Sequence, residues 1–145
     1  MADIKLKYDA ATAIAITIDN VVAGAIATSS AIDNSANLYR DILIEVSIAD
    51  IAEAGNFIAN LYLSSSVDGT NYSMANSANL GIAAFLGSVP LIGAGTWRSR
   101  AFSAARAFGG TLPPYIKLVV YNDSGVSFAA SGNSAQMIGV FETVA

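Results

Sequence analysis

The most regular feature of this sequence is an alternation of apolar and polar side chains with a period of two, which is typical of β-strands that bury one face. In DIKLKY (residues 3–8), Ile4, Leu6 and Tyr8 lie on one side and two lysines on the other. In TAIAITI (residues 12–18), three isoleucines alternate with smaller residues. Both segments are therefore predicted to be half-buried strands.

Two longer segments repeat the alternation. RDILIEVSI (residues 40–48) is predicted to bury one set of side chains and expose the other; the buried set is Ile42, Ile44, Val46 and Ile48, and the exposed set is Asp41, Glu45 and Ser47. NFIANLYL (residues 56–63) is predicted to bury Phe57, Ala59, Leu61 and Leu63. The dipeptide Asp68-Gly69 follows and predicts a reverse turn, because glycine adopts positive φ and aspartate bonds its own following backbone.

The stretch LPPYIKLVVYNDSG (residues 112–125) predicts a strand with an unusual outer face. Its two prolines disfavour helix at the entry, and the residues from Asn122 onward are turn formers. One face would be buried, and it consists of Ile116, Leu118 and Val120. The other face is too apolar to be simply solvated, since it consists of Tyr115, Lys117, Val119 and Tyr121. We therefore expect another sheet or another subunit to cover it.

The remaining segments complete an all-β pattern. FLGSVPL, TWRSRAF, VSFAAS and AQMIGVFETV read as further short strands, whereas ADIAEAG, NSANLGIAAFLG and AFSAARAFGG read as short helical or loop excursions. Eight or more short strands separated by turn signals favour an antiparallel β-sandwich that is jelly-roll-like. No change of composition divides the chain, so residues 1–145 are predicted to form a single domain.

The composition is unusually poor in charged residues. Charged residues make up 12% of the chain and apolar residues 54%, whereas soluble domains average about 25% charged. Either small polar residues solvate this surface or another protein covers much of it. No apolar run is long enough to span a membrane. A net charge of −4 without a broad basic face argues against a nucleic-acid partner.

Catalytic chemistry has little support in the sequence. There is no cysteine and no histidine, which removes the common nucleophile pairs and the usual zinc ligands. Asp50, Glu53 and Glu45 read as a helix cap and surface carboxylates and not as the acid and base of a glycosidase. The loop VDGTNY lacks the residue order of a calcium loop. We expect no enzymatic activity, no catalytic residue, no metal and no cofactor.

Arginines and aromatic residues are the candidates for contact with a partner. On one strand, Arg98 and Arg100 would share a face, with Trp97 on the other, and Arg106 follows nearby. Two guanidinium groups side by side suit the carboxylates of a neighbouring subunit or of a sugar acid. The rings of Tyr115 and Tyr121 suit an interface or a sugar-binding platform equally well.

Two parts of the sequence resemble small virion proteins of tailed double-stranded DNA phages. They are the C-terminal third, LPPYIKLVVYNDSGVSFAASGNSAQMIGVFETV, and the segment ANLYLSSSVDGTNYS. The resemblance implies a capsid decoration, or cement, protein on the virion surface that is made in the host cytoplasm. Its partners would be the major capsid protein and copies of itself, with a trimer preferred, and residues 1–40 would serve as an arm that adds a strand to a neighbour. The resemblance transfers no site residue.

Two other interpretations remain open at the level of the sequence. One is a carbohydrate-binding β-sandwich in a tail or adhesion assembly, which requires aromatic rings converging on one exposed face. The other is a head–tail adaptor or tail component, which differs from a decoration protein mainly in its ring symmetry.

Overall fold

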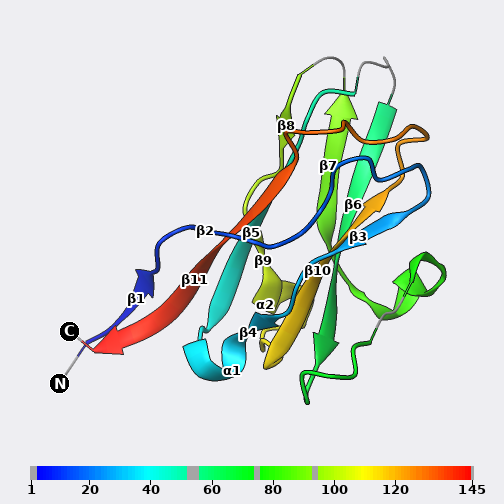
Figure 1. Cartoon of the computed structure of the whole chain (residues 1–145). Coiled ribbons are helices and arrows are strands. Elements are labelled where there is room, and N and C mark those ends of the chain that lie inside the picture. Colours follow the sequence, from blue (N-terminus) through cyan, green and yellow to red (C-terminus); the bar gives the residue numbers. More distant parts are fainter. Residues whose placement is uncertain (1–2, 52–55, 74–75, 93–94, 145) are drawn as a thin grey trace.

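The computed structural model describes residues 3–51, 56–73, 76–92 and 95–144 of the chain. Two antiparallel sheets pack against each other (Figure 1). The first sheet contains β1 (Ile4–Tyr8), β2 (Thr12–Ala13), β11 (Ser134–Val144), β5 (Asp41–Ile48), β8 (Trp97–Arg98) and β9 (Phe102–Ser103). The second sheet contains β3 (Ile26–Thr28), β4 (Ile32–Asp33), β10 (Tyr115–Asn122), β6 (Asn56–Ser66) and β7 (Ala84–Ile92).

The order of strands within the sheets confirms the predicted sandwich. The first sheet runs β1-β11-β5-β8, with β2 beside β11 and β9 beside β5, and the second runs β3-β10-β6-β7, with β4 beside β10. Three pairs of short strands each lie along a single neighbouring strand and so occupy the position of one strand in their sheet; the pairs are β1/β2, β3/β4 and β8/β9. The chain then changes sheet at every connection except the one from β6 to β7, which is the connectivity of a jelly roll.

The core lies between the two sheets and follows the alternation of the long strands. On β5, the four predicted core side chains are 0% exposed. Ala59, Leu61 and Leu63 on β6 are also fully buried, as are the three predicted core residues of β10; the side chain of Phe57 lies outside the described residues. Ser47 is the exception on β5, because it was expected to face solvent and is 8% exposed.

Two predicted strands take other forms. Residues 126–131 (VSFAAS) form a loop, whose backbone bonds the loop after Ile18 through Phe128 N to Val21 O and Asn20 N to Ala129 O. TWRSRAF is split into β8 and β9, because the Ser99 hydroxyl accepts the hydrogen bond of the Val46 amide between them. These side-chain and loop bonds replace the regular ladder that the alternation predicted.

The N-terminal residues supply strands to both sheets of their own chain. Only Thr12 and Ala13 of the segment 12–18 are β-strand, although Ile14 and Ile18 are buried as expected. Residues 26–33 provide β3 and β4 on the edge of the second sheet. An exchange of residues 1–40 between subunits stays a prediction.

The first and last strands form a two-stranded ribbon that extends past the rest of the sandwich (Figure 1). β1 pairs with β11 from Ile4 opposite Val144 to Tyr8 opposite Val140, whereas β5 pairs with β11 only as far as Val140. We call residues 4–8 and 140–144 the terminal ribbon. The predicted burial of β1 is wrong: Ile4, Leu6 and Tyr8 are 69%, 57% and 60% exposed. No layer of the described chain covers this face of the ribbon.

The excursions from the sheets are short. They comprise α1 (Asn34–Asn37), the 3-10 helix η1 (Ser77–Ile82) and α2 (Ala104–Ala107). Asp33 caps α1 through its carboxylate, and the Asn76 side chain caps η1, so the repeated tetrapeptide NSAN occurs at the start of two helical turns. The helical turn predicted in ADIAEAG falls largely on residues 52–55, which lie outside the described residues.

The chain's own loop after β6 packs on the Tyr115 and Lys117 part of the outer face of β10, and coverage of this face by another subunit stays a prediction. Val119 is 0% exposed, the Lys117 ammonium lies 4.1 Å from the centroid of the Tyr72 ring, and Gly69 lies against the Tyr115 ring. Asp68 organises this loop by accepting bonds from the amides of residues 70 and 71 and from the Asn71 side chain. These bonds hold the pKa of Asp68 well below its usual range.

A close contact between the sheets leads to a first prediction. At Gly87, where a bulge shifts the pairing of β6 with β7, a Cβ atom would overlap the Phe102 ring. We expect Gly87→Ala to lower the free energy of unfolding by about 1–3 kcal/mol, because the ring must move within a packed contact. Urea unfolding measures the loss. Gly81→Ala is the control, since a Cβ there meets nothing within 4 Å; equal losses in the two variants would contradict the packing argument.

Candidate partner-binding site

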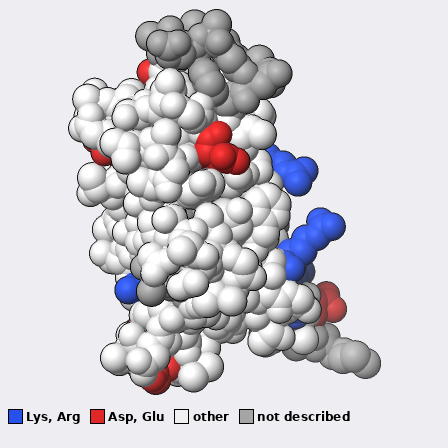
Figure 2. All heavy atoms as spheres, turned by 90° about the vertical axis from the view of Figure 1, so that its right-hand side faces the viewer, with Lys and Arg blue, Asp and Glu red and all other residues white. Residues whose placement is uncertain are grey.

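A groove lies where the edge of one sheet meets the edge of the other. β7 forms its wall on the second sheet, and β8, β9 and α2 form its wall on the first. We call it the basic groove and define it by Phe85, Leu86, Arg98, Arg100, Phe102 and Arg106. Figure 2 shows one face of the molecule, on which charged side chains are few. Most of the lysine and arginine atoms visible there lie along one border of this face.

Three of the predicted site residues line the basic groove, and their contact with a partner stays a prediction. Arg98 and Arg100 are both exposed and line the same groove, whereas the Ser99 side chain between them is buried. Trp97 is half-buried, packs against the core and also lines the groove. Arg106 joins the two other arginines from the last turn of α2.

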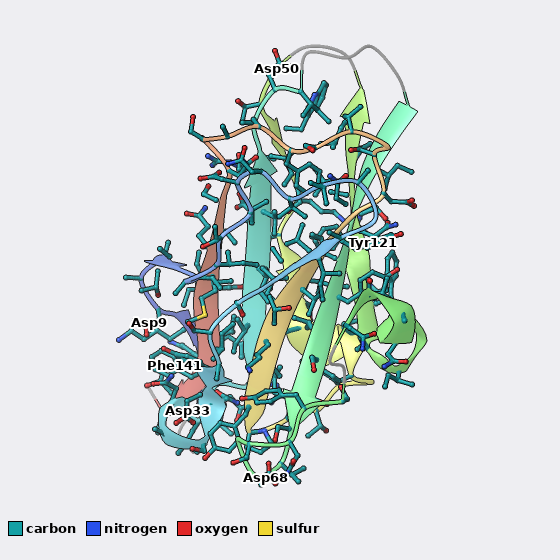
Figure 3. All side chains as sticks on the ribbon, turned by 45° about the vertical axis from the view of Figure 1, so that its right-hand side comes forward. Asp9, Asp33, Asp50, Asp68, Tyr121 and Phe141 are labelled. Atoms are coloured by element: carbon teal, nitrogen blue, oxygen red, sulfur yellow. The ribbon has the colours of Figure 1, made fainter. Side chains whose placement is uncertain are left out.

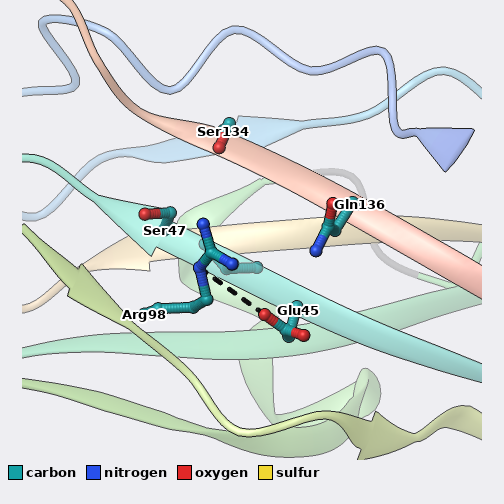
Figure 4. A pocket seen from close by; sticks show the side chains of 6 residues that line it. Glu45, Ser47, Arg98, Ser134 and Gln136 are labelled. Atoms are coloured by element: carbon teal, nitrogen blue, oxygen red, sulfur yellow. Dashed lines mark ion pairs between the residues drawn. The ribbon is translucent and has the colours of Figure 1, made fainter. Parts of the chain in front are cut away.

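The arginines of the groove differ in their partners. The Nε atom of Arg98 lies 3.6 Å from Oε1 of Glu45, on the outer face of the first sheet (Figure 4). The guanidinium carbon of Arg100 lies 5.1 Å from the centroid of the Phe102 ring, within range of a cation–π interaction. Among the described residues, neither Arg100 nor Arg106 forms an ion pair. The charges of Arg100 and Arg106 are therefore not neutralised by any described carboxylate.

The two predicted tyrosines lie away from the basic groove. Both belong to β10 in the second sheet, and both are half-buried. Tyr115 accepts a hydrogen bond from the Ser35 hydroxyl at 3.3 Å, and Tyr121 lies opposite Asn60 and Ile26 in the sheet (Figure 3). The structure therefore brings Trp97, Arg98 and Arg100 together but separates them from Tyr115 and Tyr121.

Phe85 is the most exposed of the apolar residues that define the basic groove, none of which was singled out from the sequence. Its side chain is 56% exposed, and its ring packs edge-on against Tyr62 with centroids 5.5 Å apart. In FLGSVPL it looks like an ordinary strand residue. The sequence signal was indirect, because an alternation that buries Leu86 leaves Phe85 on the outer face.

A second surface is the outward side of the terminal ribbon. Opposite residues of an antiparallel pair lie on the same face, so the pairing of β1 with β11 gathers four exposed apolar side chains. We call them the apolar ribbon face: Ile4, Leu6, Tyr8 and Val144. A shallow hollow lined by Leu6, Tyr8, Leu43 and Val140 continues this face toward α2. Glu142 lies opposite Leu6 on the same face, where it forms an ion pair with Arg40.

The base of the terminal ribbon is fixed by a tyrosine. The Tyr39 hydroxyl donates a hydrogen bond of 2.7 Å to Oδ2 of Asp9, and the Tyr39 ring lies on Gly139 and tilts against Phe141 (Figure 3). This bond lowers the pKa of Asp9 and raises the pKa of Tyr39. The ribbon therefore has a defined direction relative to the sandwich.

The parts of the chain that the structure describes contain no group of three or more histidine, cysteine, aspartate or glutamate side chains able to hold a metal ion. None of their helices has the length and apolar character needed to cross a membrane. Comparisons of the sequence with models of protein families and with curated proteins find no match.

Proposed function

We propose that this protein is a non-enzymatic structural protein of a phage virion, which binds and stabilises the capsid as a decoration protein. The observation that carries the proposal is the apolar ribbon face, whose side chains are 57–72% exposed on a ribbon that extends past the sandwich. The sequence resemblance to small virion proteins supports the same role.

The physical argument concerns what the terminal ribbon needs in order to be stable. A two-stranded ribbon is only marginally stable in water by itself. β1 pairs with β11 on one edge, and among the described residues no strand pairs with its other edge. Exposed apolar side chains beside an open edge are suited to association with another chain. A capsid subunit or a second copy of the protein would cover both features at once.

The carbohydrate-binding alternative stays a prediction, and the aromatic residues chosen for it are divided between the two sheets. A sugar platform needs aromatic rings that converge on one exposed face. Here Trp97 packs against the core beside the basic groove, while Tyr115 and Tyr121 are half-buried on the other sheet. The second candidate is a head–tail adaptor. It would use the same terminal ribbon for association, but the copies would form a ring of a different symmetry.

The test measures assembly with and without the apolar ribbon face. We expect light scattering at micromolar concentration to give the mass of a trimer for the wild-type protein, and sedimentation to show that it binds empty heads of the phage that encodes it. Leu6→Glu should weaken both associations by about 10–100-fold, because burying leucine is worth about 1.5–3 kcal/mol and a buried unpaired charge costs more.

Val67→Glu is the matched control, since Val67 is 85% exposed in a loop far from the ribbon in the sequence. It should leave trimer mass and head binding unchanged. The proposal is contradicted by a wild-type protein that stays monomeric and leaves the heads undecorated, or by equal effects of the two glutamate variants. A ring of another symmetry that adds to tails would favour the adaptor.

A further inference from the structure

The basic groove concentrates positive charge on an acidic protein. The chain has seven basic residues and a net charge of −4, yet Arg98, Arg100 and Arg106 line one continuous edge. No aspartate or glutamate is among the described residues that line it. The local charge is therefore opposite in sign to that of the whole chain, and an anionic partner is the one that it suits.

Arg100 and Arg106 supply most of the positive charge that lines the groove. Arg98 is partly neutralised by Glu45. Arg100 stacks near Phe102, and Arg106 is exposed at the end of α2. Guanidinium groups bind carboxylates through two parallel hydrogen bonds, so Arg100 and Arg106 offer two such sites along the groove.

The floor between these arginines is apolar. Phe85 is 56% exposed, and the buried side chains of Leu86 and Phe102 also line the groove. The β7 edge is poorly suited to adding a strand, because Pro90 has no amide hydrogen and a bulge interrupts the regular ladder near Leu86. Side chains, and not main-chain pairing, would therefore select the occupant.

We propose that the basic groove binds an extended acidic segment of a partner protein, with its carboxylates on Arg100 and Arg106 and its apolar side chains against Phe85 and Phe102. A protein segment fits better than a nucleic acid, because a groove that follows a phosphate backbone needs a longer run of cations than these three arginines supply. The groove is distinct from the apolar ribbon face, so this inference goes beyond the proposed function.

The test is fluorescence anisotropy with a fluorescein-labelled peptide of three Glu-Leu repeats. We expect the wild-type protein to bind it, and added salt to weaken binding because the groove is exposed. Arg100→Gln and Arg106→Gln should each raise the Kd about tenfold, as expected for the loss of one charge-assisted pair. Arg98→Gln should raise the Kd less, since the Arg98 guanidinium already forms an ion pair with Glu45. Arg100→Lys should fall between wild type and Arg100→Gln.

The double variant Lys5→Gln/Lys7→Gln is the matched control for Arg100→Gln/Arg106→Gln, because it removes the same charge at the terminal ribbon. It should bind the peptide like wild type, and so should Leu6→Glu, which separates this inference from the proposed function. Circular dichroism checks that each variant is folded. The inference is overturned if wild type does not bind the peptide, if both double variants lose binding equally, or if an oligothymidylate of equal charge binds more tightly than the peptide.

Discussion

Replacing Asn122 with aspartate is expected to lower the free energy of unfolding by about 3–5 kcal/mol. Asn122 is 0% exposed at the end of β10. Its Nδ2 atom donates to the carbonyls of Val21 and Val126, both at 2.7 Å. Its Oδ1 atom accepts from the amide and hydroxyl of Ser124. Aspartate has almost the same shape, but an ionised carboxylate has no hydrogen to donate to the two carbonyls.

Urea unfolding at pH 7 measures the loss for Asn122→Asp, and Asn79→Asp, at an exposed position in η1, is the control with an expected change of about 0.5 kcal/mol or less. Burial and the two carbonyls should raise the pKa of the new carboxyl in the folded state above its unfolded value of about 3.9. Protonation then favours the folded state, so the deficit should shrink as the pH falls through the raised pKa. A loss below about 1 kcal/mol, independent of pH, would refute this account.

Truncation of Leu118 to alanine is expected to cost about 2–5 kcal/mol. The side chain is 0% exposed on β10, the strand between β3 and β6, and it faces the first sheet across the core. Tyr121→Ala on the same strand tests the opposite face, where the side chain is half-buried. Chemical unfolding should give a clearly smaller loss for Tyr121→Ala. Equal losses would mean that the two faces of β10 are equally embedded, contrary to the observed burial.

The long central strands could be predicted because local and tertiary requirements agree there. In β5, β6 and β10, branched apolar residues alternate with other residues, and the same alternation decides which side chains enter the core. The pattern failed at β1, since it shows that one side is apolar but not whether anything covers that side. It also failed at residues 126–131, whose backbone partners lie in a loop more than 100 positions earlier in the sequence.

The candidate site could be predicted only where its residues are close in sequence. Alternation along one strand was enough to place Arg98 and Arg100 on a shared face. Arg106 joins them because α2 packs beside β5, through contacts such as the Ala105 amide with Asp41. Tyr115 and Tyr121 are separated from the groove because β6 lies between β10 and β7, which forms the groove wall on that sheet. Both outcomes depend on the order of strands, which turn signals do not encode.

The pairing of Ile4 with Val144 places the two ends of the described chain at the tip of the same ribbon. A pulling force applied between them acts across the β1–β11 pair, along the direction of its hydrogen bonds. The bonds then break one after another from the tip and do not share the load, so the pair opens at low force. The first sheet would lose β1 before the force reaches the pairing of β5 with β11, and the ribbon is thus the part of the molecule that yields first.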